Sequence, residues 1–293
     1  IENIEPPVRL SFFPYASAYA EHSSADGSIT ESVNGGMDVK YGITDAFTLD
    51  MTLIPDFGQV AFDQVVLNLG PFEQLFAENR AFFTEGVDLF NKGNIFFSRR
   101  IGQTPTGASD IDTLESEEIL ENPSSAQLLN AVKITGRTNS GLGIGFLNSI
   151  TEKTEAVIRD NNTGTKRNLI TEPLTNYNVL VLDQQYGNNS SIALVNTNVL
   201  RNGAFTDANV SAMALNHNNK RATQNLRAQA KMSNRFTITG TETGYATELD
   251  WRVTAGKWRP RLGHFFVDRG YNPNDLGRNF RTNRHTFVAD LDY

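Results

Sequence analysis

The sequence predicts an all-β fold, an antiparallel up-and-down β-barrel that spans a membrane. Apolar and polar residues alternate in strand-length segments, and turns rich in Gly, Asn and Asp separate these segments. The chain has 293 residues and a mean hydropathy of −0.36, and no run approaches the ~18 consecutive apolar residues of a membrane helix. A barrel strand needs only ~9–11 residues with an apolar side chain at every second position, so this hydropathy is compatible with a barrel.

The N-terminal part predicts a strand and then a hairpin. Residues 8–22 form the first expected strand, in which Pro14 favours a sheet edge or a bulge. Residues 37–41 and 47–53 then alternate on either side of a turn at 42–45, with one apolar face and one charged face. In a barrel the apolar face meets lipid and the charged face meets the lumen. A strand pair on a soluble core would give the same pattern.

Residues 55–102 break the alternation, because they are rich in Phe and in charge without a period of two. We expect a plug-like, irregular segment near residues 55–93 inside the barrel, with a short helix in part of 72–83. Residues 93–101 return to strand character. The acidic residues 103–130 that follow are expected to form a long external loop, as outer-membrane barrels often have.

From residue 131 onward the chain predicts an up-and-down series of hairpins. Residues 132–136 and 142–148 are expected to pair as strands across a turn at Asn139-Ser140-Gly141. Residues 160–164 are expected to form another turn, because they are rich in Asn, Asp and Gly, which tolerate a positive φ. A further hairpin joins 177–186 to 191–200. More strands are expected at 210–216, 225–232, 236–241, 245–254, 261–267 and 285–293. With about a dozen strands and no βαβ alternation, we expect one domain over residues 1–293.

Composition excludes several classes of function. The chain has no cysteine, which removes disulfides, zinc-thiolate sites and cysteine nucleophiles. Its net charge is −7 and its pI is near 5.2, so it lacks the basic footprint of a nucleic-acid-binding protein. The sequence begins at Ile1 without a signal-peptide pattern, so we expect a processed protein or a fragment of a longer one.

Two blocks of sequence resemble a known family: GGMDVKYGITDAFTLDMTLIPDFGQV (residues 35–60) and NRAFFTEGVDLFNKGNIFFSRRIG (79–102), with a weaker match at NPNDLGRNFRTN (272–283). The family is a barrel domain of unknown function in large envelope proteins of Bacteroidetes and related bacteria. In these proteins a carbohydrate-binding module of family 9 type precedes the barrel. The chain departs from the family pattern at three positions. Ala61 and Phe62 stand where the family usually has an acidic residue followed by Ala, and Ala81 stands where it usually has Pro. The resemblance implies a sugar-binding module before Ile1 and further strands after Tyr293, so that the chain is the N-terminal portion of a larger barrel.

The strongest candidate site is a group of charged residues in and beside the irregular segment: Glu78, Arg80, Glu85, Asp88, Arg99 and Arg100. Acidic and basic side chains together could form a lumenal constriction or plug that filters solutes. The structural alternative is a salt-bridged packing segment that fills the barrel. The mixture of charges suits the interior, because Arg or Lys facing lipid costs ~2–4 kcal/mol at the bilayer midplane.

Metal and cofactor sites are not predicted. Four acidic side chains offer the oxygen ligands that calcium prefers, but their spacing is not that of an EF-hand, and a solvated loop is the preferred interpretation: Asp110, Asp112, Glu115 and Glu117. The histidines are far apart and lack metal-ligand spacing: His22, His217, His264 and His285.

Catalysis is not predicted either. Ser211 or Ser233 near His217 would be needed as a nucleophile and base, but no motif supports such a pair. Six aromatic side chains could stack on sugars, although an interfacial girdle is the preferred interpretation: Tyr15, Tyr19, Trp251, Trp258, Phe265 and Phe266.

The sequence therefore predicts an outer-membrane β-barrel of the Gram-negative envelope, acting as a conduit or as a glycan-associated envelope protein. We expect no enzymatic activity, no cofactor and no metal. The expected partners are outer-membrane lipid, glycans or other envelope proteins, and not nucleic acid. Two alternatives remain: a barrel with lumenal hydrolase activity, and a soluble all-β adhesin or binding domain.

Overall fold

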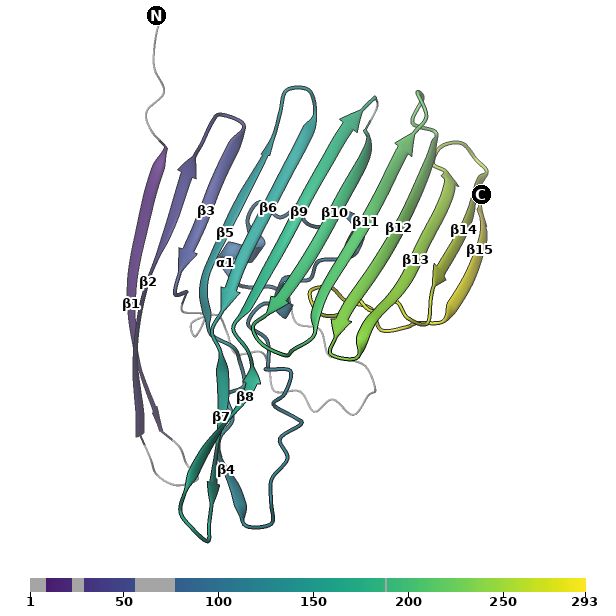
Figure 1. Cartoon of the computed structure of the whole chain (residues 1–293). Helices are drawn as coiled ribbons and strands as arrows, with labels where there is room; N and C mark the ends of the chain where they lie inside the picture. The colour runs from purple at the N-terminus through teal and green to yellow at the C-terminus, as the bar shows by residue number, and fades with distance from the viewer. Residues whose placement is uncertain (1–8, 23–28, 56–76, 188) are drawn as a thin grey trace, which may run out of the picture.

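The computed structural model describes residues 9–22, 29–55, 77–187 and 189–293, and antiparallel strands dominate it (Figure 1). Twelve strands form one sheet in the order β1-β2-β3-β5-β6-β9-β10-β11-β12-β13-β14-β15. Their bounds are β1 Leu10–His22, β2 Ile29–Gly42, β3 Phe47–Leu53, β5 Leu128–Arg137, β6 Leu142–Thr151, β9 Thr175–Tyr186, β10 Ser190–Arg201, β11 Asp207–Asn218, β12 Gln224–Thr237, β13 Gly240–Val253, β14 Arg259–Val267 and β15 Arg284–Asp292. The predicted all-β, antiparallel, up-and-down fold is confirmed. Within the described residues the sheet is open, with β1 and β15 as its edges.

A second, three-stranded sheet interrupts the up-and-down path. It consists of β4 (Glu117–Glu121), β7 (Thr154–Asp160) and β8 (Lys166–Glu172), in the order β4-β7-β8. Figure 1 shows it projecting beyond one end of the large sheet. Because β6 pairs directly with β9, strands β7 and β8 are an insertion between neighbours. The stretch 103–130, predicted as a long external loop, also holds β4 and the start of β5, which the prediction missed. Strand β4 forms through pairing with a distant partner, which local alternation does not reveal.

The expected hairpins at β2–β3, β5–β6 and β9–β10 are confirmed by their registers. Two strand predictions were wrong. Residues 93–101 contain the 3-10 turns η1 (Lys92–Asn94) and η2 (Ser98–Arg100), because Gly93 (φ 71°) and Asn94 (φ 51°) interrupt the extended backbone. The segments 225–232 and 236–241 also do not form separate strands: β12 runs without a break to Thr237, and the chain turns at 238–239.

The irregular segment is described only in part. Residues 56–76 of the predicted plug lie outside the described residues, and these include 72–76 of the stretch 72–83 in which a short helix was expected. Within the described part of that stretch, α1 (Ala81–Thr84) is a single helical turn. Residues 77–103, together with 271–280, lie along one face of the sheet. We call these two stretches the covering segment and this side of the sheet the covered face.

The hydrophobic core lies between the covering segment and the covered face. The covering segment contributes five of its buried apolar side chains: Phe83, Phe90, Ile95, Ile101 and Leu276. The sheet contributes the others: Leu128, Ala131, Leu147, Tyr177, Val179, Val181, Val195, Val199, Ala208, Val210 and Ala212. Small residues permit the close approach, because a Cβ on Gly93 would lie 3.0 Å from the Ala212 Cβ and one on Gly145 would lie 3.3 Å from the Phe90 ring. Full burial of a side chain such as Phe90 contributes about 1.5–3 kcal/mol.

The other side of the sheet, the open face, is apolar but exposed. Strand β9 alternates buried Val179, Val181 and Asp183 with exposed Leu180 and Leu182. The same alternation places large apolar side chains on the open face of the neighbouring strands, among them Leu194, Met213, Tyr245, Leu249, Leu262 and Phe287. The sheet thus has two chemically different faces, and only one of them is packed against other described parts of the chain.

Candidate functional site on the covered face

The first part of the candidate site is a buried ion pair inside the covering segment. The Arg80 guanidinium donates from Nε (2.8 Å) and Nη2 (2.7 Å) to the two carboxylate oxygens of Glu78. It also donates to the carbonyl oxygens of Ile101 (2.7 Å) and Ser98 (2.8 Å), and it lies 4.4 Å from the centroid of the Phe83 ring. Both charged side chains are largely buried. One guanidinium therefore joins the start of the covering segment to the η2 turn.

The ionisation of Glu78 depends on this partner. Burial disfavours the carboxylate and acts to raise its pKa. Hydrogen bonds and charge from Arg80, with a hydrogen bond from the Ser98 hydroxyl, outweigh burial, so the pKa of Glu78 lies below its usual value. Glu78 is therefore ionised at neutral pH.

The other four predicted site residues are dispersed. Glu85 forms an ion pair with Lys40 of β2. Asp88 is exposed and Arg99 is half-buried. Arg100 donates from Nε to the Gly277 carbonyl (3.1 Å), which connects the two stretches of the covering segment. The structure thus pairs Glu78 with Arg80 and gives Glu85 and Arg100 other partners, and the lumenal constriction stays a prediction.

Sequence reasoning missed a group of charges on the covered face of the sheet itself. The wholly buried carboxylate of Asp183 (β9) forms ion pairs with Arg137 of β5 (2.5 Å) and with Lys92 of the covering segment (3.3 Å). Further along β5, the buried Lys133 Nζ lies 3.6 Å from Asp50 of β3 and donates to the Phe82 carbonyl oxygen (2.8 Å). These side chains attach the covering segment to three strands.

A second missed group lies where the three-stranded sheet joins the large one. Arg201 is nearly inaccessible and forms ion pairs with Glu172 (3.5 Å) and Asp275 (2.9 Å). Asp275 also pairs with Arg235 of β12 (3.1 Å). This chain of charges fixes the second stretch of the covering segment to β10 and β12.

A third missed group lies on β13, β14 and β15. Asp250 is buried between Arg252 (2.8 Å) and Arg261 (2.6 Å), and Arg261 also lies 3.7 Å from Asp290. Part of the signal was present in the sequence, because Asp183, Asp250 and Arg261 each stand next to a large apolar residue of the open face. Their partners could not be read from it, because pairing depends on register between strands.

The weaker candidates are not brought together. Glu117 pairs with Arg167 across the three-stranded sheet (2.7 Å), and within the described residues no group of acidic or histidine side chains could hold a metal ion. Ser211 and His217 lie on the same strand but on the order of 20 Å apart at ~3.3 Å per residue. The His217 ring instead stacks on Tyr186, with centroids 6.1 Å apart.

The predicted aromatic residues occupy both faces. Tyr15 donates to the Ile54 carbonyl oxygen (2.9 Å), which fixes β1 to the end of β3. The ring centroids of Trp258 and Tyr293 lie 4.7 Å apart beside the ends of β14 and β15. The Phe266 ring contacts the His285 ring. Trp251 and Phe265 are half-buried on β13 and β14, and the Tyr19 side chain lies outside the described part. Among the helices of the described residues, none is long and apolar enough to cross a membrane.

Comparison with known proteins places the chain in a family. The family model described as "Domain of unknown function (DUF5916)" matches residues 6–293. Outer-membrane-expressed OmpT of Vibrio cholerae is 12% identical, with 99% of this chain and 97% of that chain covered and a TM-score of 0.34. The loop L8 deletion mutant of OmpT is also 12% identical, with 88% and 93% covered and a TM-score of 0.33. These TM-scores are too low to add to the fold assignment, which rests on the sheet itself. No curated protein is significantly similar to the chain. Because the family model matches nearly its whole length, the chain belongs to the DUF5916 family, a domain of unknown function.

Proposed function

We propose that the chain forms the wall of an outer-membrane β-barrel in a Gram-negative envelope, with a conduit or a glycan-associated role. The observation that carries this proposal is the difference between the two faces of the sheet. A soluble monomer rarely exposes a contiguous apolar patch larger than a few hundred Å². The open face exposes large apolar side chains on strand after strand. A barrel in lipid requires such a face.

The strand lengths support the same proposal. Strands in soluble proteins are usually about 5–6 residues long, whereas β9, β10 and β11 have 12 residues each. At ~3.3 Å per residue and a tilt of ~40°, such a strand rises about 30 Å, close to the ~25 Å apolar band of outer-membrane barrels. A soluble sandwich would have to cover the open face with a second sheet, and the described residues place none there.

The charged groups on the covered face favour a conduit over a purely structural barrel. Pores select solutes through rings of charged side chains, and Asp183, Asp250 and Arg261 lie on the side that would face the lumen. The covering segment fills part of that side, so the proposed conduit is partly plugged in this state. The glycan-associated role rests on the resemblance to Bacteroidetes barrels that follow a family 9 carbohydrate-binding module. The chain itself is proposed to be one domain with residues 55–93 as its plug.

Site-directed labelling provides a direct test, because the chain has no native cysteine. Leu249→Cys on the open face and Glu248→Cys on the covered face are adjacent on β13, so each is the control of the other. With a nitroxide label and the protein in lipid vesicles, position 249 should be accessible to oxygen and protected from a water-soluble nickel relaxation agent. Position 248 should show the opposite preference. Nickel access at both positions, with a protein that is monodisperse without detergent, would reject the membrane location.

The conduit role needs its own measurement. In planar bilayers the protein should give small conductance steps that increase when the covering segment is loosened by Lys92→Met, which removes one of its charged contacts with the sheet. A bilayer that stays silent for both proteins would exclude the conduit and leave the envelope-binding role.

A further inference from the structure

The two stretches of the covering segment are held against the sheet in different ways. The first stretch, residues 77–103, contributes four large apolar side chains to the core, and all are almost fully buried: Phe83, Phe90, Ile95 and Ile101. In the second stretch, residues 271–280, Leu276 belongs to this core and Tyr271 is buried apart from it. Burial of apolar area is the dominant favourable contribution to packing. The second stretch therefore depends on polar contacts more than the first stretch does.

The polar contacts of the second stretch centre on one carboxylate. Asp275 Oδ1 lies 2.9 Å from Arg201 Nη1 of β10, and its Oδ2 lies 3.1 Å from Arg235 Nε of β12. The backbone N–H of Asn272 also donates to the Ser233 hydroxyl oxygen of β12 (2.9 Å). These contacts fix the second stretch across the strands from β10 to β12.

Each of the two arginines that hold Asp275 has a second carboxylate on a strand. Arg201 Nε lies 3.5 Å from Glu172 at the end of β8, and Arg235 Nη1 lies 3.4 Å from Glu242 of β13. A buried ion pair normally stays closed because separation leaves a buried charge without a partner, at a high cost in free energy. If Asp275 leaves, Arg201 retains Glu172 and Arg235 retains Glu242. Departure of the second stretch therefore leaves neither arginine of the sheet unpaired.

The second stretch has internal hydrogen bonds that do not depend on the sheet. Asn274 Nδ2 donates to the Asn279 carbonyl oxygen (3.1 Å), and Asn274 Oδ1 accepts from the Asn279 N–H (2.6 Å). The Gly277 N–H donates to the Pro273 carbonyl oxygen (2.7 Å). Residues 281–283, which lead from the stretch into β15, are exposed (the yellow connection between β14 and β15 in Figure 1). The stretch can therefore move as one unit without losing these internal bonds.

We propose that residues 271–280 form a releasable gate on the covered face, whereas residues 77–103 are permanent packing. The gating role rests on the conduit proposed above. In the closed arrangement, which this structure shows, Asp275 is bound to Arg201 and Arg235. In the open arrangement Asp275 faces water, and each arginine retains its other carboxylate. Release uncovers part of β10 to β12 and so widens the partly plugged conduit.

Hydrogen exchange of the full chain in vesicles tests the release directly. Amides of 271–280, and the Phe97 amide that donates to the Leu276 carbonyl oxygen (2.8 Å), should exchange through a local opening that spares the rest of the first stretch. Asp275→Asn should accelerate this exchange about tenfold or more, the size of one hydrogen bond to a charged group. Protection of residues 79–95 should not change. Exchange of the two stretches at one common rate, in the native protein or in Asp275→Asn, would overturn the proposal.

Glu172→Gln gives a result that a merely structural role would not give. Its amide oxygen can still accept the hydrogen bonds that Glu172 receives from the Thr106 N–H and hydroxyl, both 2.8 Å long. The closed state retains Asp275 as the partner of Arg201, but the open state now contains a buried guanidinium without a carboxylate. Exchange of 271–280 should therefore slow by about tenfold or more. If Glu172 only strengthened the closed structure, its loss would accelerate exchange, and that result would refute the gate.

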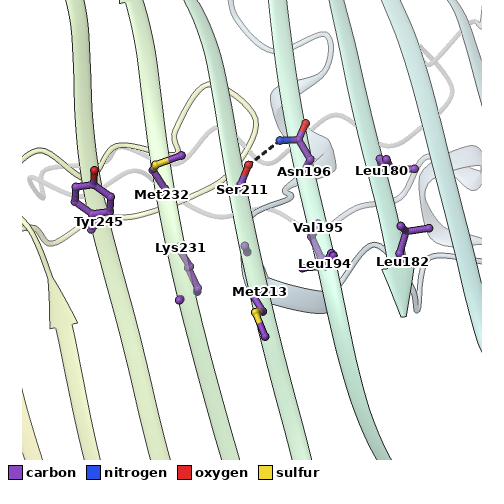
Figure 2. A pocket seen from close by; sticks show the side chains of 12 residues that line it. Leu180, Leu182, Leu194, Val195, Asn196, Ser211, Met213, Lys231, Met232 and Tyr245 are labelled. Atoms are coloured by element: carbon purple, nitrogen blue, oxygen red, sulfur yellow. Dashed lines mark hydrogen bonds between the residues drawn. The ribbon is translucent and has the colours of Figure 1, made fainter. Parts of the chain in front are cut away.

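Met232→Leu is the matched control. Met232 is next to Ser233 on β12 but faces the opposite side of the sheet, where it lines a shallow hollow of about 520 Å³ together with Leu194 and Tyr245 (Figure 2). This variant should leave the exchange of 271–280 unaltered, and an acceleration equal to that of Asp275→Asn would overturn the proposal.

Conductance in planar bilayers separates the gate from the conduit. Asp275→Asn should give larger or longer open steps than the native protein, and Glu172→Gln should give smaller or shorter ones. Open steps that are identical in all three proteins would refute the gate. The expected exchange pattern together with silent bilayers would retain the releasable stretch and reject the conduit.

Discussion

Arg80→Met should detach part of the covering segment from the rest of the protein. Arg80 is buried, and its guanidinium donates two hydrogen bonds to Glu78 and one each to the carbonyl oxygens of Ser98 and Ile101. Met retains most of the volume but leaves a buried carboxylate without its cation. Removal of one partner of a buried pair typically costs about 3–5 kcal/mol. We expect a loss of this size, confined to the covering segment.

Hydrogen exchange read by mass spectrometry would measure this loss. Amides of residues 77–103 should exchange faster in Arg80→Met, whereas those of β9, β10 and β11 should keep their protection. The double variant Glu78→Gln/Arg80→Met removes the stranded charge and should recover part of the stability, with a coupling energy of about 0.5–3 kcal/mol. Arg80→Lys retains the charge but cannot make the bidentate contact, so it should give an intermediate loss.

The pH dependence of the stability of the covering segment gives an independent check, because its sign should reverse between the native protein and Arg80→Met. In the native protein the pKa of Glu78 is lowered, so its contribution to stability is complete above the unfolded value of about 4.3 and is lost as pH falls through the folded pKa. In Arg80→Met the largest remaining influence on the pKa of Glu78 is burial, which raises it against the hydrogen bonds from the Ser98 hydroxyl and the residue 80 backbone N–H, so acidification should stabilise the variant. A destabilisation below about 1 kcal/mol, or the same pH trend in both proteins, would show that the pair does not hold the segment in place.

Three further predictions concern other parts of the chain. The pKa of Glu117 is lowered to about 2, first by its hydrogen bond from Arg167. Protection of the β4 amides from hydrogen exchange should therefore be complete above about pH 4.5 and should fall towards pH 2. Glu117→Gln should abolish this pH dependence, and wild-type protection that does not change with pH would contradict the prediction. Leu249→Arg should destabilise the protein in lipid by about 2–4 kcal/mol if the open face is in the membrane. If that face is in water, the loss should be no more than about 0.5 kcal/mol. Urea unfolding in vesicles, with Leu249→Ala as control, distinguishes the two locations. Gly244→Ala should lower the unfolding midpoint, because its Cβ would lie 2.1 Å from the backbone carbon of Gly270. The control is Gly35→Ala, whose Cβ would lie at an ordinary 3.6 Å from the Tyr15 carbonyl oxygen. An unchanged midpoint for Gly244→Ala would show that the 268–271 turn gives way.

Most of the fold could be predicted from the sequence, for a local reason. A strand with one apolar face has a period of two, and a turn such as Asn139-Ser140-Gly141 interrupts that period visibly, so β5 and β6 were located from residues next to each other in the chain. The same method failed at 93–101. There Ile95 and Ile101 are apolar because they are buried in the covering segment, and not because the backbone is extended.

The candidate site was predictable only in part. The charged residues of the irregular segment stood out because charge is unusual beside so many Phe residues, and Glu78 and Arg80 are close enough in sequence to pair. The ionic groups of the sheet were missed because their members come from strands far apart in the sequence. Arg137 and Asp183, for example, are separated by 46 positions.

The sequence by itself determined that this protein is a series of long, two-faced antiparallel strands, because alternation is a property of neighbouring residues. Only the tertiary structure decided what each face meets. It placed the covering segment against one face and left the other open, and it brought Glu172, Arg201, Asp275 and Arg235 into one chain of charges. The physical reason is register: a shift of one residue between two strands would move an entire set of side chains to the opposite face, and the pattern within one strand does not fix its alignment with the next.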